Sequence, residues 1–264
     1  MKSNSRTFEQ LLDGYFNSFY ADHPADATYV GLSSGEGRLN NVTLAALSRQ
    51  HRRRQAALAN LDTIAPSALS NEQNLDRLAF RARLLREHED FERGRHTLDP
   101  SGIDAVFEFL LRELQRGETN PKRAVNNIRS LLVESQRYLN QAAKLIDRPE
   151  RVWRNIMDDT FKASGSFFDA IVNFLKINGN KKEDSFLIRL AKRSCAKYHK
   201  SAMSKRLAKP GSFAIGTTML QRRIRDELGL DYTVGQVEAV AVAEIERIGV
   251  LLKKASDKLE RNKS

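Results

Sequence analysis

Residues 121–146 read "PKRAVNNIRSLLVESQRYLNQAAKLI", and this stretch decides the fold class. Its apolar side chains Val125, Ile128, Leu132 and Leu139 follow one another at helical spacing, and Ser135 is the polar member of the same stripe. A period of about 3.6 residues is typical of an amphipathic helix with one buried face. No run of the chain alternates convincingly with a period of two. The sequence therefore predicts an all-α protein, an elongated multi-helix bundle.

The same periodicity predicts about nine helices along the chain. We expect them near residues 7–21, 43–63, 70–95, 102–116, 121–146, 150–177, 182–207, 213–228 and 233–261. The last of them carries a long stripe made up of Val234, Val237, Ala241, Ile245, Ile248, Leu252, Ala255 and Leu259. Glycine, proline and asparagine cluster between the helices, as turn residues do.

Four helix starts have a local signal. In three places a Ser or Thr precedes a Gln by three residues, which predicts capping boxes that satisfy the free backbone N–H groups of a helix start. The pairs are Thr7 with Gln10, Ser70 with Gln73, and Thr233 with Gln236. Pro149 is predicted to take a first helical position, where its missing N–H costs nothing.

The composition favours one helical domain. The chain has 264 residues, of which 41% are hydrophobic and 29% charged, enough for a substantial core. We expect a single domain over residues 1–264, with a candidate sub-boundary near 117–121. The single Cys195 suits a reducing compartment, and neither a signal peptide nor a membrane-spanning stretch is evident in the sequence. These features predict a cytoplasmic protein without a membrane partner.

Two segments carry a resemblance to a known family. The opening "FEQLLDGYFNSFYADHPADATYVGL" gives an aromatic helix followed by a proline, an Ala-Thr pair and a glycine, and "NLDRLAF" follows further on. Near the other end stands "FAIGTTMLQRRIRDELGLDYTVGQVEAVAVAEIERI". Together these resemble the bacterial family catalogued as domain of unknown function 885. The positions that match its pattern are Tyr15, Pro24, Ala27, Thr28, Gly31, Asp76, Gly216 and Asp231. Where the family commonly has Glu then Tyr after the glycine, Thr217, Thr218 and Met219 stand here.

The resemblance implies a helical scaffold that lacks the metal-binding residues of the family. Members of the family look like metallopeptidases because a helix in their carboxy-terminal half carries a His-Glu…His pattern, and this chain resembles the amino-terminal half alone. The resemblance thus implies a non-catalytic helical scaffold, with zinc expected only together with the other half. The expected partner is a second copy or a separately encoded carboxy-terminal half. An exposed apolar patch is then expected on the helices covering 102–178.

The histidines and the cysteine do not form a site by their spacing. In "LREHEDFERGRH" the residue four positions after His88 is Glu92, and His96 is eight positions away, too far to share one ion on a straight helix. The sequence thus predicts a charged helix face here and no zinc site. The remaining histidines have no partner at ligand spacing. They are His23, His51 and His199. Cys195 is interpreted as a packing residue. No catalytic, metal or cofactor residue is predicted.

The charge distribution supplies an alternative function. Lys and Arg number 44 against 33 Asp and Glu, for a formal net charge of +11. Between Lys192 and Lys209 no acidic residue occurs. If this segment is helical, its cations could contact phosphates of a nucleic acid or another polyanion. The candidate residues are Arg193, Lys197, Lys200, Lys205 and Arg206. A solvated basic face is the competing interpretation, since Tyr198 is the segment's one aromatic residue.

Overall fold

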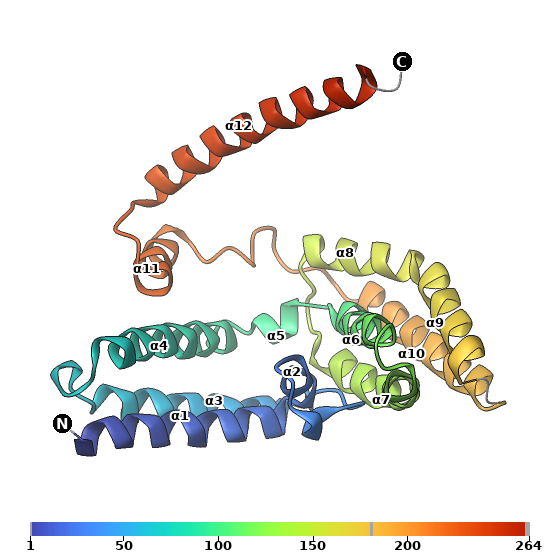
Figure 1. Ribbon diagram of the computed structural model, residues 1–264, viewed down its shortest axis with the longest axis horizontal. Coiled ribbons are helices and arrows are strands. Elements are labelled where there is room, and N and C mark those ends of the chain that lie inside the picture. Colours follow the sequence, from blue (N-terminus) through green and yellow to red (C-terminus); the bar gives the residue numbers. More distant parts are fainter. Residues whose placement is uncertain (1, 180–181, 262–264) are drawn as a thin grey trace.

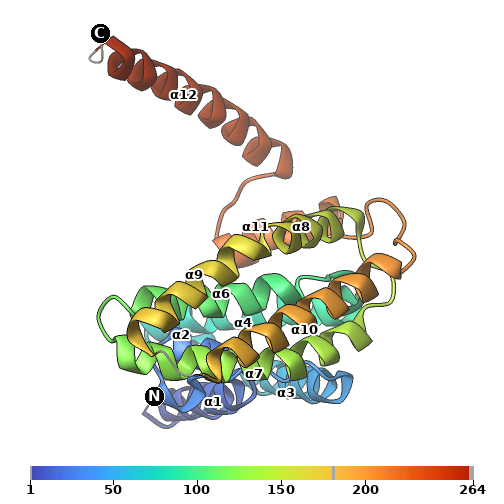
Figure 2. The same cartoon turned by 90° about the vertical axis from the view of Figure 1, so that its right-hand side faces the viewer.

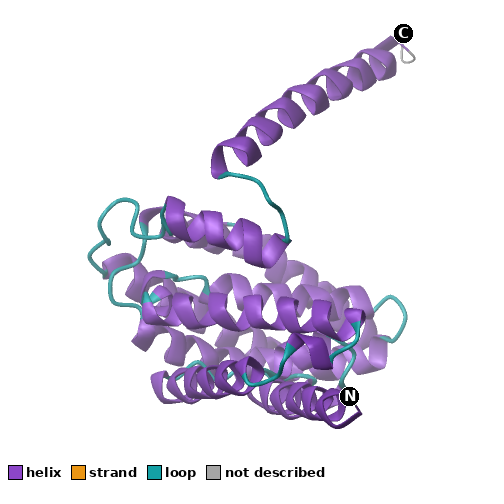
Figure 3. Cartoon of the chain, turned by 90° about the vertical axis from the view of Figure 1, so that its left-hand side faces the viewer, coloured by secondary structure: helices purple, strands orange, loops and turns teal. Residues whose placement is uncertain are grey.

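The computed structural model describes residues 2–179 and 182–261, and every regular element in these ranges is a helix (Figure 3). The all-α prediction is confirmed. The α-helices are α1 (Lys2–Asp22), α2 (Pro24–Tyr29), α3 (Leu44–Asp62), α4 (Asn71–Glu92), α5 (Arg95–Leu98), α6 (Gly102–Arg116), α7 (Pro121–Leu145), α8 (Arg151–Lys162), α9 (Ser164–Asn178), α10 (Asp184–Ser204), α11 (Thr217–Leu228) and α12 (Val234–Arg261). Two short 3₁₀ turns, η1 (Ser33–Gly35) and η2 (Pro66–Ala68), lie between them.

These helices outnumber the nine expected ones for local reasons. α2 and α5 are too short to show the repeating apolar spacing from which the other helices were predicted. The segment expected as one helix over 150–177 is two, because the chain breaks at Ala163 between α8 and α9. The sequence there is Ser-Gly-Ser after Ala163, and these residues are weak helix formers at which helices commonly kink.

The predicted helix starts are partly confirmed. Ser70 and Gln73 form the complete capping box of α4. Thr233 and Gln236 exchange the same two hydrogen bonds before α12, at 2.8 and 3.2 Å. The other two predictions are wrong. Thr7 lies inside α1, which already begins at Lys2, and Pro149 precedes α8 by two residues. The α8 cap is Glu150, whose carboxylate accepts from the Val152 N–H at 2.7 Å.

One hydrophobic core joins α1, α3 and α4, which run alongside one another in Figure 1. Phe8 of α1, Leu61 of α3, and Phe80 and Leu84 of α4 are buried at its centre. Tyr15 extends this core, because its ring packs edge-on against that of Phe80 with a centroid distance of 5.0 Å. The three long helices thus form a bundle of their own, which we call the first bundle.

A second core lies among α6 to α10, with α7 at its centre; we call this the second bundle (Figure 2). The stripe of α7 is buried against α6 and α10, as its periodicity predicts. Its polar member Ser135 is also buried, and its hydroxyl donates to the Leu132 carbonyl at 2.7 Å. α10 closes this core through Tyr198, whose hydroxyl accepts the Gly102 N–H at 3.2 Å. A Cβ at Gly102 would lie 2.8 Å from that ring, so the close approach requires glycine.

The segment around α2 and η1 ties the two bundles together. Arg116 of α6 donates to the Thr28 carbonyl at 2.7 Å, and Arg137 of α7 donates to the Leu39 carbonyl at the same distance. Leu39 is itself buried in the core of the second bundle. The loop at 117–120, near the expected sub-boundary, joins α6 and α7, which pack on each other. The passage from the first bundle to the second instead runs through α5.

α11 and α12 lie outside both cores. α11 rests on α4, and α12 extends away from the rest of the molecule (Figures 1 and 2). Gly216 and Gly229 cap the two ends of α11, and both have positive φ angles. None of the described helices combines the length and the apolar character needed to cross a membrane.

Candidate functional site

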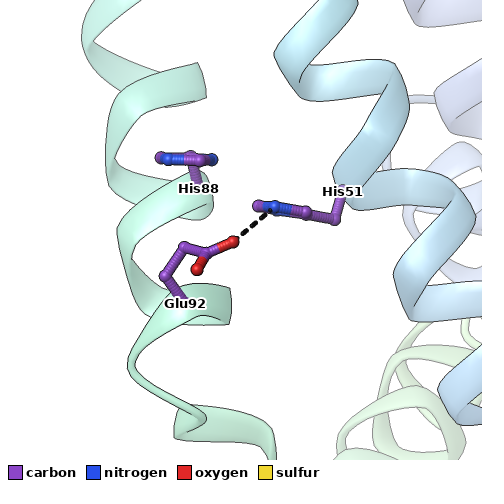
Figure 4. A group of neighbouring side chains, drawn as sticks. All are labelled: His51, His88 and Glu92. Carbon is purple, nitrogen blue, oxygen red and sulfur yellow. Dashed lines mark ion pairs between the residues drawn. The ribbon is translucent and has the colours of Figure 1, made fainter.

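The end of α4 presents side chains to two neighbours at once. His88 and Glu92 face α3, where His51 meets them (Figure 4). Glu89 and Asp90, between them in sequence, bind arginines of α11. Successive residues of a helix point about 100° apart, so side chains from one short segment can contact two neighbouring helices. The charged stretch is therefore more than a solvated face, although the expected ion pairing on α4 is present, with Arg83 and Glu87 2.9 Å apart.

A cluster of three residues joins α3 to α4, and we call it the His₂Glu cluster. It consists of His51, His88 and Glu92, and one ligand atom from each lies within 4.8 Å of the other two. His51 Nε2 is 2.8 Å from Glu92 Oε1. The rings of His51 and His88 are nearly parallel, with centroids 4.8 Å apart. Two imidazoles and one carboxylate are the donor set of many zinc sites.

The environment of His51 favours the neutral form of its ring. The residue is only 6% exposed, and this burial is the main cause that lowers its pKa. The nearby His88 and Arg54 lower the pKa further, while Glu92 acts in the opposite direction. In the neutral ring the proton on Nε2 can be donated to Glu92, which leaves the lone pair on Nδ1.

Two nitrogen atoms of the cluster lack hydrogen-bond partners. Among the described residues, Nδ1 of His51 and Nδ1 of His88 are buried and have no partner. A buried polar atom without a partner costs roughly 1–3 kcal/mol, so such atoms in a folded protein call for an explanation. Glu92 is different, because 58% of its side chain is exposed and the cluster thus opens toward solvent on one side.

His96 belongs to the surroundings of the cluster. The ring of Phe91 stacks on that of His51, with centroids 4.3 Å apart, and the ring of His96 stacks on the same Phe91, with centroids 4.9 Å apart. His88, His51, Phe91 and His96 therefore form a column of rings between α3, α4 and α5. Gly94, in the left-handed conformation, turns the chain after α4, so His96 lies on α5. Burial lowers the pKa of His96.

Sequence spacing gives His51 no partner, whereas the structure places it beside His88 and Glu92. His51 lies 37 positions before His88, and only the packing of α3 on α4 brings them together. A weak signal was present, because His88 and Glu92 are four residues apart on one helix and a carboxylate can ligate as well as a histidine. Counting only His-to-His spacings overlooks this pair.

The other two histidines have structural partners. His199 Nε2 lies 2.7 Å from an Asp158 oxygen, and its ring stacks on Phe161 at 4.1 Å. His23 Nδ1 lies 2.8 Å from the Phe19 carbonyl and its ring stacks on Phe19. Both contacts join neighbouring turns or packed helices, as satisfied histidines do.

Cys195 is a packing residue, as interpreted from its sequence. It is buried in the core of the second bundle. Burial raises the pKa of its thiol to about 12, so the reactive thiolate is scarce at neutral pH.

The candidate polyanion residues divide into two groups. Arg193, Lys197 and Lys200 are exposed on α10, and their spacing places them along one stripe of this helix. Lys197 also donates to Asn140 of α7 at 3.3 Å. The helix ends at Ser204, three residues before the expected end, so Lys205 and Arg206 lie in the loop that follows.

The residues that match the family pattern near the amino terminus build the entry into α2. Pro24 opens this helix, Ala27 is buried in it, and the Thr28 hydroxyl donates to the Pro24 carbonyl at 3.0 Å. Gly31 follows with a φ of +89°. Tyr15 lies in the first bundle, where burial first and the charge of Glu87 second raise its pKa to about 12.

The remaining family positions lie on the outside. Asp76 is exposed on α4, and Asp231 is exposed in the loop that joins α11 to α12. Gly216 caps the start of α11 with a φ of +81°. These positions shape turns and surfaces, and they do not converge with the His₂Glu cluster.

Exposed apolar side chains lie on α12 as well as on the helices where the sequence suggested a patch. The helices covering 102–178 bury most of their large apolar side chains in the second bundle, although Val152, Ile156 and Ile177 are exposed there, so the patch expected on them stays a prediction. α12 also exposes its stripe: Ile245 is 71% exposed and Leu252 is 66% exposed. Leu75 and Leu78 of α4, with Leu228 of α11, line an open hollow near the base of this helix and are exposed as well.

These observations define an all-helical protein with a His₂Glu cluster between α3 and α4 and an uncovered apolar helix, α12. The model of the family described as "Bacterial protein of unknown function (DUF885)" matches residues 24–264, and the chain belongs to this family. No curated protein matches the chain.

A solved structure shares the fold. It is a protein of Shewanella oneidensis described as "a putative lipoprotein of unknown function", and it superposes with a TM-score of 0.71 at 16% sequence identity. The match covers 96% of this chain and 48% of that chain. The chain therefore spans about half the length of this solved structure.

Proposed function

We propose that this chain is a non-catalytic helical scaffold that acts as the amino-terminal half of a two-half DUF885 protein. In this proposal the stripe of α12 packs against the other half. The single observation that carries it is the exposure of this stripe on a helix whose main described contact is with α11. The length comparison agrees, because the chain aligns with about half of the Shewanella oneidensis protein.

The chemistry of α12 supports a protein partner. Ile245, Ile248, Leu252 and Leu259 fall within a narrow sector of the helix, and all four are exposed. Helices in proteins owe most of their stability to burial of such a face, and isolated helices are marginal in water. A contiguous exposed apolar face of this kind marks an interaction surface. The partner we propose is therefore apolar and helical, as the remaining half of an all-α fold would be.

In this proposal the hydrolase chemistry belongs to the other half. The resemblance that identified the family implies a zinc-binding His-Glu…His helix in its carboxy-terminal half. This chain would then contribute the framework on which that half is held. The chain by itself is expected to hydrolyse no peptide, whether or not zinc is added. The cytoplasmic location stays a prediction.

Binding to the completing half tests the proposal. The chain is titrated with the polypeptide that completes the family's length, encoded in the same genome, and the dissociation constant is measured. The double variant Ile245→Asp/Leu252→Asp should weaken binding at least about 100-fold, because two charges would enter an apolar contact. Val250→Asp is the matched control, since Val250 is also exposed but lies on the opposite side of α12.

Two results would overturn the proposal. One is a double variant that binds as tightly as the Val250→Asp control. The other is a chain that stays monomeric and binds neither the completing polypeptide nor a hydrophobic dye. A second copy on the same stripe would instead appear as a dimer in light scattering, and it would contradict the two-half assignment.

A second candidate function rests on α10. Arg193, Lys197 and Lys200 form an exposed basic stripe, and the chain carries a formal net charge of +11. We propose this stripe as the contact surface if the chain binds a polyanion. Affinity for a labelled DNA duplex should then fall steeply with salt. The triple variant Arg193→Gln/Lys197→Gln/Lys200→Gln should abolish the binding, and unchanged affinity would remove this candidate.

A further inference from the structure

We propose that His51, His88 and Glu92 bind one divalent transition-metal ion of the zinc type, which links α3 to α4. The three residues come from two packed helices, and one ligand atom from each lies within 4.8 Å of the others. Two imidazole nitrogens and a carboxylate oxygen match the preferences of zinc, and magnesium or calcium would prefer an all-oxygen set. This inference goes beyond the proposed scaffold function and does not depend on it.

The distance between His51 and Glu92 needs only a small adjustment, whereas His88 must change its rotamer. His51 Nε2 and Glu92 Oε1 are 2.8 Å apart, whereas two ligands about 2.0–2.1 Å from a tetrahedral zinc lie about 3.3 Å from each other. The ion would take the place of the proton that these two atoms share. His88 completes the set by turning its ring out of the stack with His51, because the bond to a metal lies in the plane of the imidazole.

In the described part of the chain the cluster also holds two buried nitrogens without partners: Nδ1 of His51 is not the atom that would bind the ion, whereas Nδ1 of His88 is available to it. His51 is more than nine-tenths buried, and its Nδ1 has no partner among the described residues. Nδ1 of His88 is a buried atom that also has no partner among the described residues, although His88 as a whole is half-buried.

The charges around the cluster are balanced. Glu92 supplies one negative charge to the ion. Besides His88, the positive group that acts on His51 is Arg54 of the same helix, and Glu87 of α4 pairs with Arg54 at 3.4 Å. The repulsion from Arg54 is therefore partly offset. The exposed Glu92 leaves a path to solvent, so a water molecule can fill the fourth position of a tetrahedral site.

Zinc titration of the tag-free chain tests this site. The protein is dialysed against a chelator, and zinc chloride is then titrated by calorimetry. We expect one zinc ion per chain and a zinc-dependent rise of the melting temperature, because a ligand that binds only the folded state stabilises it. His88→Asn and Glu92→Gln should each weaken zinc binding by at least about 100-fold, since even loss of a supporting partner of a ligand costs about 10–100-fold.

The control lies in the same column of rings. His96→Asn changes a histidine that stacks on Phe91 but does not belong to the cluster, and it should bind zinc like the unchanged chain. Both ligand variants change groups less buried than His51, and circular dichroism checks that their helices are intact. The proposal is overturned if the chain takes up no zinc, or if His88→Asn and Glu92→Gln bind it as tightly as His96→Asn. The variant Ile245→Asp/Leu252→Asp should bind zinc like the unchanged chain. Failure of the zinc proposal can therefore be distinguished from failure of the scaffold proposal.

Discussion

α7 and α12 have the same kind of sequence and opposite surroundings. Each is a long amphipathic helix with apolar residues at steps of three or four. In α7 the stripe is buried, and Leu132 is 0% exposed, whereas the stripe of α12 faces outward. Amphipathic spacing thus predicts that a helix has a face to bury. It does not predict whether the surface that covers this face lies in the same chain.

The largest expected difference comes from shortening a leucine in each stripe. Leu132→Ala in α7 should lower the free energy of unfolding by about 2–5 kcal/mol, because it leaves a cavity in the second bundle. Leu252→Ala in α12 should change it by less than about 0.5 kcal/mol, since an exposed side chain loses little burial. Urea unfolding followed by circular dichroism measures both. Equal losses in the two variants would mean that α12 is already covered in solution.

A smaller difference is expected at the helix caps. Ser70→Ala removes the hydroxyl that caps α4 and should destabilise the chain by about 1 kcal/mol, because α4 is part of the first bundle. Thr233→Ala removes the equivalent cap of α12. It should reduce the helicity of α12 and leave the global unfolding midpoint unchanged. Hydrogen exchange resolved by helix distinguishes the two effects, and a shift of the global midpoint by Thr233→Ala would count against an independent α12.

The smallest effect is a pH dependence confined to the first bundle and α5. Burial lowers the pKa of both His51 and His96. Below the ordinary histidine pKa of about 6.5, the unfolded chain therefore binds protons that the folded chain does not. Stability from these two residues is present above that pH and is lost as the pH falls below it. Among the groups near His51, His88 and Arg54 strengthen this effect, and Glu92 opposes it.

Hydrogen exchange at pH 7.5 and pH 5.5, corrected for intrinsic rates, measures this effect. Protection of α3 and α4 should fall at the lower pH, while that of α7 stays unchanged. His51→Phe retains a ring for the stack with Phe91 and removes the titration, so its α3 and α4 should lose less protection. A loss of protection that is the same in α3, α4 and α7 would contradict a local origin in the buried histidines.

Much of the fold could be predicted from local signals. The spacing of apolar residues gave the long helices α3, α4, α6, α7 and α10 to within a few residues of their bounds. The Ser70–Gln73 and Thr233–Gln236 pairs marked true helix starts. The errors arose where a signal was ambiguous. Thr7 and Gln10 have the spacing of a capping box and lie within α1, and one helix was expected where α8 and α9 are separate.

The candidate site was less accessible to prediction. Arg193, Lys197 and Lys200 were predicted from the sequence as candidate polyanion contacts of a helical segment, and the structure leaves them exposed on α10. His51 was assigned no partner, since its contacts come from another helix. Spacing along one helix reports on the neighbours of a residue within that helix alone, so a ligand set assembled from two helices leaves only part of its pattern in either segment.

The sequence by itself determined that this protein is helical, where most of its long helices lie, and which faces of them are apolar. These properties follow from interactions between residues three or four positions apart, which the order of amino acids specifies directly. Only the tertiary structure decided that His51 meets His88 and Glu92, that Glu89 and Asp90 hold α11, and that the face of α12 stays uncovered. These outcomes depend on how whole helices pack, and helix packing is set by the shapes of many side chains together.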